Sequence, residues 1–182
     1  MAGRIIAFEP VAPPWARMLI LGSMPSVESL NQGFYYAHPR NAFWHILADV
    51  YGEPLPVDIP GKVALLTRHD IALWDVLQSC ERQGSLDSAI RQPTPNDFRS
   101  LFLRCSGIRQ IRFNGGTAER LFMKWGRPFT EGRDCRRVPS SSPAYTISYE
   151  RKLAQWRQAL NYEYESRSYH PQKAVWRGTQ RG

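Results

Sequence analysis

The sequence predicts an α/β fold in which a mainly parallel sheet carries helices on both faces. Short apolar segments of strand length alternate along the chain with amphipathic segments of helical period. Apolar residues make up 42% of the chain and charged residues 22%, which is typical of a globular protein. The length of 182 residues suits one domain, at roughly 150 residues per domain, and we expect that domain to span residues 1–160.

The first two predicted elements lie near the N-terminus. Residues 17–22 form an apolar run that ends in glycine, which predicts a buried strand followed by a loop at residues 22–26. A helix is expected to begin near Pro39 and to end at residues 52–54. Its apolar residues recur at helical spacing on one sector, namely Phe43, Trp44, Leu47 and Val50.

Strands and helices continue to alternate toward the C-terminus. Further strands are predicted from apolar runs at residues 71–74, 108–113 and 136–138. Further helices are predicted from their caps and apolar period, beginning near Asn96 and Asp97, and over residues 117–125 and 147–160. Residues 161–182 lack apolar periodicity, so we expect them to form a mobile, basic and aromatic tail.

Several classes of protein are disfavoured. The longest apolar runs, at residues 18–21 and 63–66, are far shorter than the ~20 residues of a membrane span, and residues 1–10 do not form a secretion signal, so we expect a cytoplasmic protein. The cysteines at 80, 105 and 135 lack metal-ligand spacing, which predicts neither a disulfide framework nor a bound metal. The GxGxxG, GxxxxGK[ST] and GxSxG patterns do not occur, although an irregular Ser-His-Asp triad stays open.

The positive charge of the chain increases toward the C-terminus. The formal net charge of +8 divides into −1 for residues 1–66, +4 for residues 67–150 and +5 for residues 151–182. Aromatic residues alternate with basic ones in the last segment, a combination that suits nucleic acid. A solvated basic surface is an equally good interpretation of the charge alone.

Two compact loops carry the residue types that chemistry would need. Residues 22–26 (GSMPS) and the following residues 32–44 offer aromatic faces for stacking a base and an amide for orienting water. Residues 139–144 (PSSSPA) offer hydroxyls and backbone N–H groups at a helix entrance, where phosphate binds readily. Both loops fall beside carboxyl ends of predicted strands, where α/β sheets bind ligands.

These loops resemble motifs of the uracil-DNA glycosylase superfamily, and most closely those of its DNA-deoxyinosine (hypoxanthine-DNA) glycosylase branch. Residues 22–26 stand at the first motif, residues 35–44 (YYAHPRNAFW) at the signature of that branch and residues 138–144 at the second motif. The resemblance spans roughly residues 17–160. It implies a three-layer α/β/α sandwich, no cofactor and no metal, damaged DNA as the partner of a monomer, and hydrolysis of the N-glycosidic bond of a flipped, deaminated base.

The resemblance implies Asn41 as the catalytic residue. In the mismatch-directed members, the third residue of the first motif is an asparagine that positions the attacking water, whereas this chain has Met24 there, which has no group that holds water in this way. We therefore expect the carboxamide of Asn41, in the HPRN string, to orient the water while a sugar cation develops. The alternative is that Asn41 only caps the helix after Pro39.

The resemblance also implies a base pocket. Tyr36 is expected to stack on the flipped base, Ser23 and Met24 to line the pocket, and Asp75 to accept the N1–H of hypoxanthine. Tyr36 packing only within the protein, and Asp75 capping a helix at Val76, stay open as alternatives. The neighbouring aromatic residues are assigned to the core, namely Tyr35, Phe43 and Trp44.

Contacts to the DNA backbone are expected from both loops. Ser140, Ser141 and Ser142 are expected to bind the phosphates that flank the flipped nucleotide, unless they serve only as a helix cap and turn. Tyr145 is expected to enter the gap left in the duplex. His38 and Arg40 are further candidates for DNA contacts, with a structural loop residue and a surface charge as their alternatives.

The expected function is a monofunctional DNA glycosylase that removes hypoxanthine, with uracil as a further candidate base, and leaves an abasic site. None of the four lysines lies in either motif, which favours simple hydrolysis over lyase chemistry, and they stand at positions 62, 124, 152 and 173. Two alternatives stay open. One is a uracil or G·T mismatch glycosylase, and the other is a catalytically silent protein that binds DNA lesions.

Overall fold

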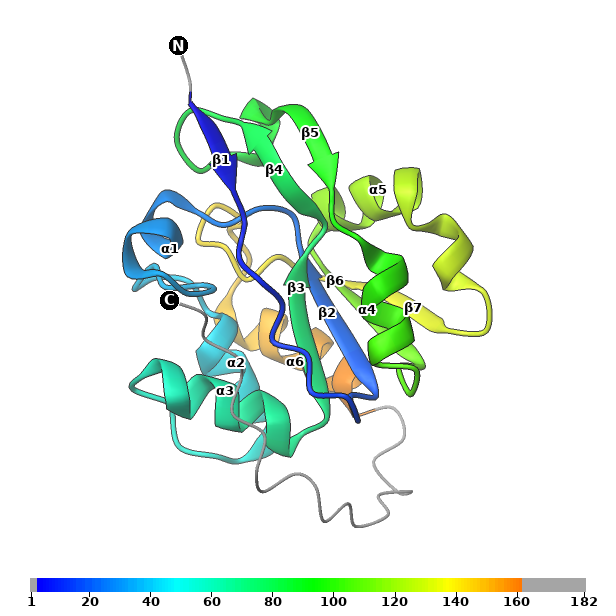
Figure 1. Ribbon diagram of the computed structural model, residues 1–182. Coiled ribbons are helices and arrows are strands. Elements are labelled where there is room, and N and C mark those ends of the chain that lie inside the picture. Colours follow the sequence, from blue (N-terminus) through cyan, green and yellow to red (C-terminus); the bar gives the residue numbers. More distant parts are fainter. Residues whose placement is uncertain (1–2, 162–182) are drawn as a thin grey trace.

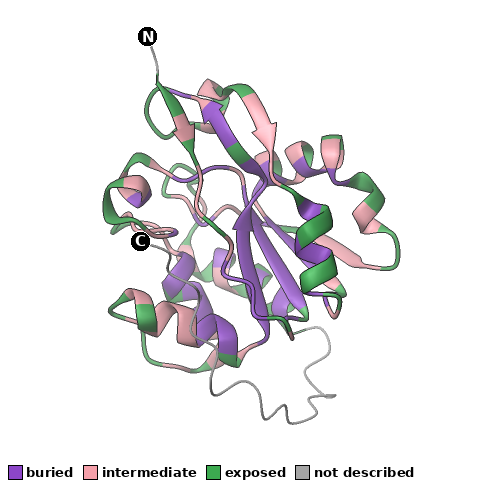
Figure 2. Cartoon of the chain, in the orientation of Figure 1, coloured by how far each residue is buried: buried purple, intermediate pink, exposed green. Residues whose placement is uncertain are grey.

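A four-stranded parallel sheet forms the centre of the computed structural model, which describes residues 3–161 (Figure 1). The strands lie in the order β3 (Ile71–Asp75), β2 (Met18–Gly22), β6 (Gln110–Asn114) and β7 (Asp134–Val138). All residues of β2 and β3 are buried, as expected for strands covered on both faces (Figure 2). Parallel register places Gly22 beside Asp75 at the carboxyl edge of the sheet.

Helices cover both faces of this sheet. On one face lie α2 (Phe43–Tyr51), α3 (Ile59–Arg68) and α6 (Tyr149–Leu160), and on the other lie α4 (Phe98–Arg104) and α5 (Gly116–Trp125) (Figure 1). Edge-to-face aromatic pairs join the helices within each layer, with ring centroids 5.8 Å apart for Phe43 and Trp156 and 4.9 Å apart for Phe98 and Phe122. The predicted three-layer α/β/α sandwich is therefore confirmed.

The predicted strands and most predicted helices form close to their expected positions. Caps explain two helix starts, because the Asp97 carboxylate accepts from the Ser100 N–H before α4 and the Ser148 hydroxyl accepts from the Arg151 N–H before α6. The helix expected from Pro39 begins only at Phe43. The preceding residues form a turn instead, in which the Asn41 N–H donates to the His38 carbonyl at 2.9 Å.

A second, antiparallel sheet and two helices were not expected. The sheet has the order β1 (Arg4–Ile6), β4 (Leu77–Glu81) and β5 (Arg91–Pro95), and the helices are α1 (Val27–Gln32) and α3. The part of the chain that the structure describes also contains two short 3₁₀ turns, η1 (Asp87–Ala89) and η2 (Arg127–Thr130). The chain passes directly from β3 into β4, so no helix begins at Val76 and the expectation that Asp75 caps one there is wrong.

The remaining expectations concern the C-terminal residues, membrane-spanning helices and the cysteines. The mobile tail was predicted for residues 161–182, and from residue 162 onward these lie outside the described residues. Within residues 3–161, no helix is long and apolar enough to cross a membrane. The three cysteines, Cys80, Cys105 and Cys135, are free thiols.

Candidate active site

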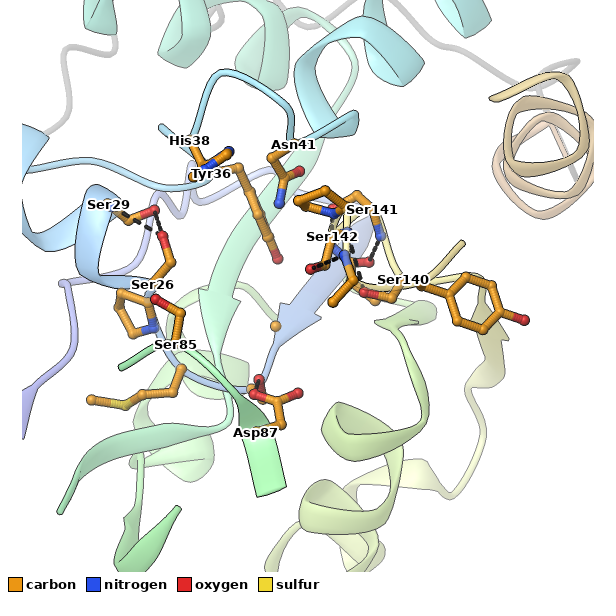
Figure 3. A pocket seen from close by; sticks show the side chains of 18 of the residues that line it. Ser26, Ser29, Tyr36, His38, Asn41, Ser85, Asp87, Ser140, Ser141 and Ser142 are labelled. Atoms are coloured by element: carbon orange, nitrogen blue, oxygen red, sulfur yellow. Dashed lines mark hydrogen bonds between the residues drawn. The ribbon is translucent and has the colours of Figure 1, made fainter. Parts of the chain in front are cut away.

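A cavity of about 530 Å³ opens at the carboxyl edge of the parallel sheet, where the last residues of β3 and β6 meet the loops that follow β2 and β7 (Figure 3). Both loops that the sequence singled out contribute to its wall. The first motif supplies residues 22–26. The second motif and the residue after it supply residues 140–145, which we call the serine loop. The segment of residues 35–41 lies between them, and residues 85–88 form a further part of the rim.

The cavity floor is built around Gly22. A Cβ atom at this position would lie only 2.4 Å from Oδ1 of Asp75 and 2.7 Å from the hydroxyl oxygen of Tyr36. Because glycine has no Cβ, the carboxylate of the neighbouring strand and the phenol of the 35–41 segment both reach the end of β2. Gly22 therefore allows these two polar groups to meet at the base of the cavity.

Asp75 is a buried carboxyl group that faces this cavity. The residue is only 3% exposed, and its Oδ2 has no hydrogen-bond partner within residues 3–161. Burial, aided by the negative charge of Asp87 and opposed by the positive charge of Arg82, raises the pKa of Asp75 from 3.8 to about 7. Asp75 can therefore carry or lose its proton near neutral pH, and its free oxygen is available to a ligand.

Asp87 and Arg82 are charged groups near Asp75 that sequence reasoning missed. The Ser23 hydroxyl donates to Oδ1 of Asp87 at 2.7 Å. The buried Arg82 donates to the backbone carbonyls of Gly84, at 2.9 Å, and of Pro25. Ser23 thus lines the cavity as expected, but its hydroxyl proton is donated to Asp87. This hydrogen bond connects residues 84–88, which we call the 84–88 loop, to the first motif.

Tyr36 presents its ring to the cavity from a left-handed backbone conformation, with φ of +52°, which bulky residues rarely adopt. The ring stacks on Phe43 with centroids 4.0 Å apart and an interplanar angle of 22°. Burial and the charge of Asp75 raise the pKa of the phenol well above its usual value, so the hydroxyl stays protonated. Tyr36 therefore packs against the protein core and also lines the cavity.

The aromatic residues assigned to the core are buried there. Tyr35 is 2% exposed and donates its hydroxyl to the Glu9 carbonyl at 2.8 Å. The indole of Trp44 donates to the Tyr35 carbonyl at 3.0 Å, and Phe43 is fully buried. These contacts fix the backbone on both sides of Tyr36, which holds that ring in place.

Asn41 lies at the boundary between the main cavity and a smaller one of about 280 Å³. Its side-chain oxygen accepts the Phe43 N–H at 3.0 Å, although the N-cap of α2 is Ala42, so Asn41 binds the first N–H of the helix from one position before the cap. A carboxamide oxygen accepts two hydrogen bonds, which leaves one lone pair for a water in the cavity. The hydrogen bond from Phe43 therefore orients the Asn41 side chain without occupying its full acceptor capacity.

His38 and Arg40 lie on different cavities. His38 lines the main cavity, and its Nδ1 accepts the Arg40 N–H at 3.1 Å, so the neutral ring carries its proton on Nε2. Arg40 is exposed and lines only the smaller cavity, together with His45 and Tyr149. Arg40 thus contributes to the neighbouring cavity and not to the wall of the main one.

The serine loop is fixed to the sheet through Asn114, another residue that sequence reasoning missed. The Asn114 amide donates to the Ser141 hydroxyl at 2.9 Å, and its oxygen accepts the Ser141 N–H at 2.8 Å. Ser141 is only 1% exposed, so it positions the loop, and we no longer expect it to contact phosphate as the sequence suggested. Ser140 and Ser142 remain partly exposed at the cavity, and their hydroxyl oxygens each accept a loop N–H.

The end of the serine loop carries Tyr145, which is 47% exposed on the rim. Behind the loop, the buried ammonium of Lys152 donates to the Ser142 carbonyl at 2.8 Å and lies 5.7 Å from the centroid of the Tyr145 ring. Burial lowers the pKa of Lys152. Met24 stands at the position where the mismatch-directed members have an asparagine. It is buried in the cavity wall and supplies only a thioether.

Comparisons with known proteins agree with this fold and site. The family model described as "Uracil DNA glycosylase superfamily" matches residues 9–164. A hypoxanthine DNA glycosylase from Methanosarcina acetivorans is 34% identical over 152 residues, which cover 82% of this chain and 93% of that protein. A hypoxanthine DNA glycosylase from Methanosarcina barkeri is 35% identical over 109 residues, which cover 59% of this chain and 69% of that protein.

A solved structure is also similar. The solution NMR structure of a candidate uracil DNA glycosylase from Methanosarcina acetivorans superposes with a TM-score of 0.76 at 31% identity, and the match covers 87% of this chain and 97% of that one. The match of the family model over most of the chain includes the cavity and both motifs. The chain belongs to the uracil DNA glycosylase superfamily.

Proposed function

We propose that this DNA glycosylase removes hypoxanthine from deoxyinosine in DNA and leaves an abasic site. The observation that carries the proposal is the unpartnered, buried carboxyl of Asp75 in the same cavity as the ring of Tyr36 and the amide of Asn41. A cavity of about 530 Å³ accommodates a flipped purine nucleotide. The names of the two Methanosarcina relatives support the choice of hypoxanthine.

Asp75 gives a physical basis for choosing hypoxanthine over adenine. The ionised carboxylate accepts the N1–H of hypoxanthine, whereas the N1 of adenine is an acceptor and is repelled by it. The protonated carboxyl can donate to the N1 of adenine, so the discrimination is expected to increase as the pH rises through about 7. The exposed part of the Tyr36 ring supplies a stacking surface that accepts a purine or a pyrimidine.

Asn41 is proposed to orient the attacking water through its remaining lone pair. An amide is too weak a base to remove a proton early, so the glycosidic bond must largely break before the water attacks. The contribution of Asn41 is then positioning, and the Phe43 N–H that fixes its side chain is part of that function.

The backbone of the DNA is proposed to lie across the cavity mouth. Ser140, Ser142 and His38 line the cavity, and we propose that their hydroxyls and the Nε2–H donate to phosphates. Arg40, on the neighbouring smaller cavity, is proposed to add a positive charge, and Tyr145 to enter the duplex. Extruding the damaged nucleotide costs a few kcal/mol, and less for a mispaired base. The protein is proposed to act on this substrate as a monomer.

Simple hydrolysis is proposed, without lyase chemistry. Of the lysines within residues 3–161, none lines the cavity, and Lys152 lies behind the serine loop with its ammonium engaged by Ser142. Lys173 lies outside the described residues. An adduct trapped by borohydride on damaged DNA would contradict this part of the proposal.

Single-turnover excision from oligonucleotides that carry one deoxyinosine, one deoxyuridine or one G·T mismatch tests the proposal. We expect the deoxyinosine substrate to be cleaved fastest. A preference for deoxyuridine or G·T would support the mismatch or uracil alternative, against which Met24 is the specific observation. Binding of all three without excision would instead indicate the silent lesion binder.

A further inference from the structure

The 84–88 loop on the rim of the cavity is held by hydrogen bonds on both sides of its central residue, Leu86. The Gly84 carbonyl accepts from the buried Arg82 at 2.9 Å, and the Ser85 hydroxyl accepts the Val27 N–H at 2.9 Å. After Leu86, the Asp87 carboxylate accepts the Ser23 hydroxyl at 2.7 Å. The loop is therefore fixed to the first motif, which also forms the cavity wall.

The side chain of Leu86 projects from this fixed loop into solvent. A single exposed leucine is ordinary on a protein surface. What distinguishes Leu86, at 62% exposed, is its location: of the large apolar side chains that are exposed within residues 3–161, only those of Leu86 and Tyr145 line the cavity. The others are Ile6, Val27, Leu55, Val57 and Leu103.

The two apolar side chains belong to different parts of the rim. Figure 3 shows Ser85, the neighbour of Leu86, on one side of Tyr36, and the serine loop that leads to Tyr145 on the other side. Asp87, the other neighbour of Leu86, is bound by Ser23 of the first motif. A nucleotide that enters the cavity between these loops has an apolar side chain of the protein on each flank.

We infer that Leu86 is a second wedge, which inserts into the base stack of duplex DNA opposite Tyr145 and keeps the damaged nucleotide extruded. This inference rests on the proposed function and extends it. An apolar side chain that replaces a flipped base offsets part of the lost stacking, and it does so best when its backbone is fixed before binding. The bonds of Gly84, Ser85 and Asp87 provide that fixed backbone.

The test compares excision of hypoxanthine from duplex and from single-stranded oligonucleotides. A single strand has no intact base stack to open, so a wedge matters only in the duplex. We expect Leu86→Ser to lower the single-turnover rate on duplex by about tenfold and to change the rate on single strands by less than about twofold. Leu86→Met keeps an apolar side chain of similar volume and is expected to retain the duplex rate within about threefold.

The matched control is Leu103→Ser on α4, which is 75% exposed, does not line the cavity and is expected to change neither rate. An equal loss on both substrates for Leu86→Ser would overturn the inference, because it would indicate damage to the loop. An unchanged duplex rate would overturn it as well.

A readout without chemistry separates this inference from the proposed function. With 2-aminopurine beside the lesion, binding of the parent protein is expected to raise the fluorescence by unstacking that base, and Leu86→Ser is expected to remove most of the increase. If the parent unstacks the duplex and Leu86→Ser does not, but the parent excises nothing, the proposed function fails while the wedge stands. If the parent excises hypoxanthine and Leu86→Ser unstacks the duplex as well as the parent, the wedge fails while the function stands.

Discussion

Replacing Asp75 with asparagine is expected to change the free energy of unfolding, relative to the parent, in a way that favours the variant more at pH 8 than at pH 4. The pKa of Asp75 is raised from 3.8 to about 7, chiefly by burial, so the folded protein holds this proton over a range in which the unfolded chain has lost it. The free energy of unfolding of the parent therefore falls as the pH rises through this window. An asparagine side chain does not ionise, so the Asp75→Asn variant is free of this loss.

The size of the effect follows from the pKa change. At about 1.4 kcal/mol per pKa unit, the rise from 3.8 to about 7 corresponds to about 4 kcal/mol of stability that the parent loses between pH 4 and pH 8. The amide of the variant must itself be buried in the cavity floor, at a cost of about 1–3 kcal/mol that does not depend on pH. The variant-minus-parent difference in unfolding free energy is thus expected to grow by a few kcal/mol from pH 4 to pH 8.

Urea unfolding of parent and Asp75→Asn at pH 4, 6 and 8 measures this difference. Asp97→Asn is a control of opposite sign, because the hydrogen bonds from Ser100 lower the pKa of Asp97 and its contribution is lost as the pH falls. The same Asp75→Asn protein is expected to lose discrimination of hypoxanthine from adenine. If the difference in unfolding free energy between parent and Asp75→Asn is constant from pH 4 to pH 8, burial does not raise the pKa of Asp75.

Two further substitutions test the cavity floor and the core. Gly22→Ala places a Cβ 2.4 Å from Oδ1 of Asp75 and 2.7 Å from the Tyr36 hydroxyl. We expect the single-turnover excision rate to fall at least tenfold, while the far-ultraviolet circular dichroism spectrum stays that of the parent. A parental rate would contradict the described geometry of the cavity floor. Arg112→Ala removes a fully buried guanidinium that donates to the Asp134 carboxylate at 2.8 Å. Urea unfolding is expected to show that the free energy of unfolding falls by about 3–5 kcal/mol. A decrease below about 1 kcal/mol would contradict this role of Arg112.

The central sheet was predictable because its strands are short apolar runs. Met18–Gly22 and Ile71–Asp75 are buried along their full length, and a short apolar run next to a turn signal is typical of a strand covered on both faces. The antiparallel sheet was not, because the polar β5 (Arg91–Pro95) contains two prolines and β1 (Arg4–Ile6) has three residues. The helix Ile59–Arg68 was missed because Pro and Gly occupy its first turn.

The site was predictable where its residues are contiguous in the sequence. The segment that carries Tyr36 and Asn41 forms one wall of the cavity, as its aromatic and amide side chains indicated. Contacts between distant segments were not predictable: Ser141 is buried by Asn114, which lies 27 positions away, and Ser23 is bound by Asp87, 64 positions away. Only the fold determines which hydroxyls stay available for DNA.

The proposed catalytic role of Asn41 is tested most directly by the single-turnover rate of hypoxanthine excision by Asn41→Ala. Removing the oxygen that orients the water is expected to lower the rate by about 100-fold or more, while DNA binding persists. Asn41→Ala also removes the hydrogen bond to the first N–H of α2, so a control is needed for the loss of such a bond at a helix start. Ser148→Ala removes the cap of α6 outside both cavities and should leave the rate unchanged. Excision by folded Asn41→Ala at the parental rate would show that Asn41 does not orient the attacking water.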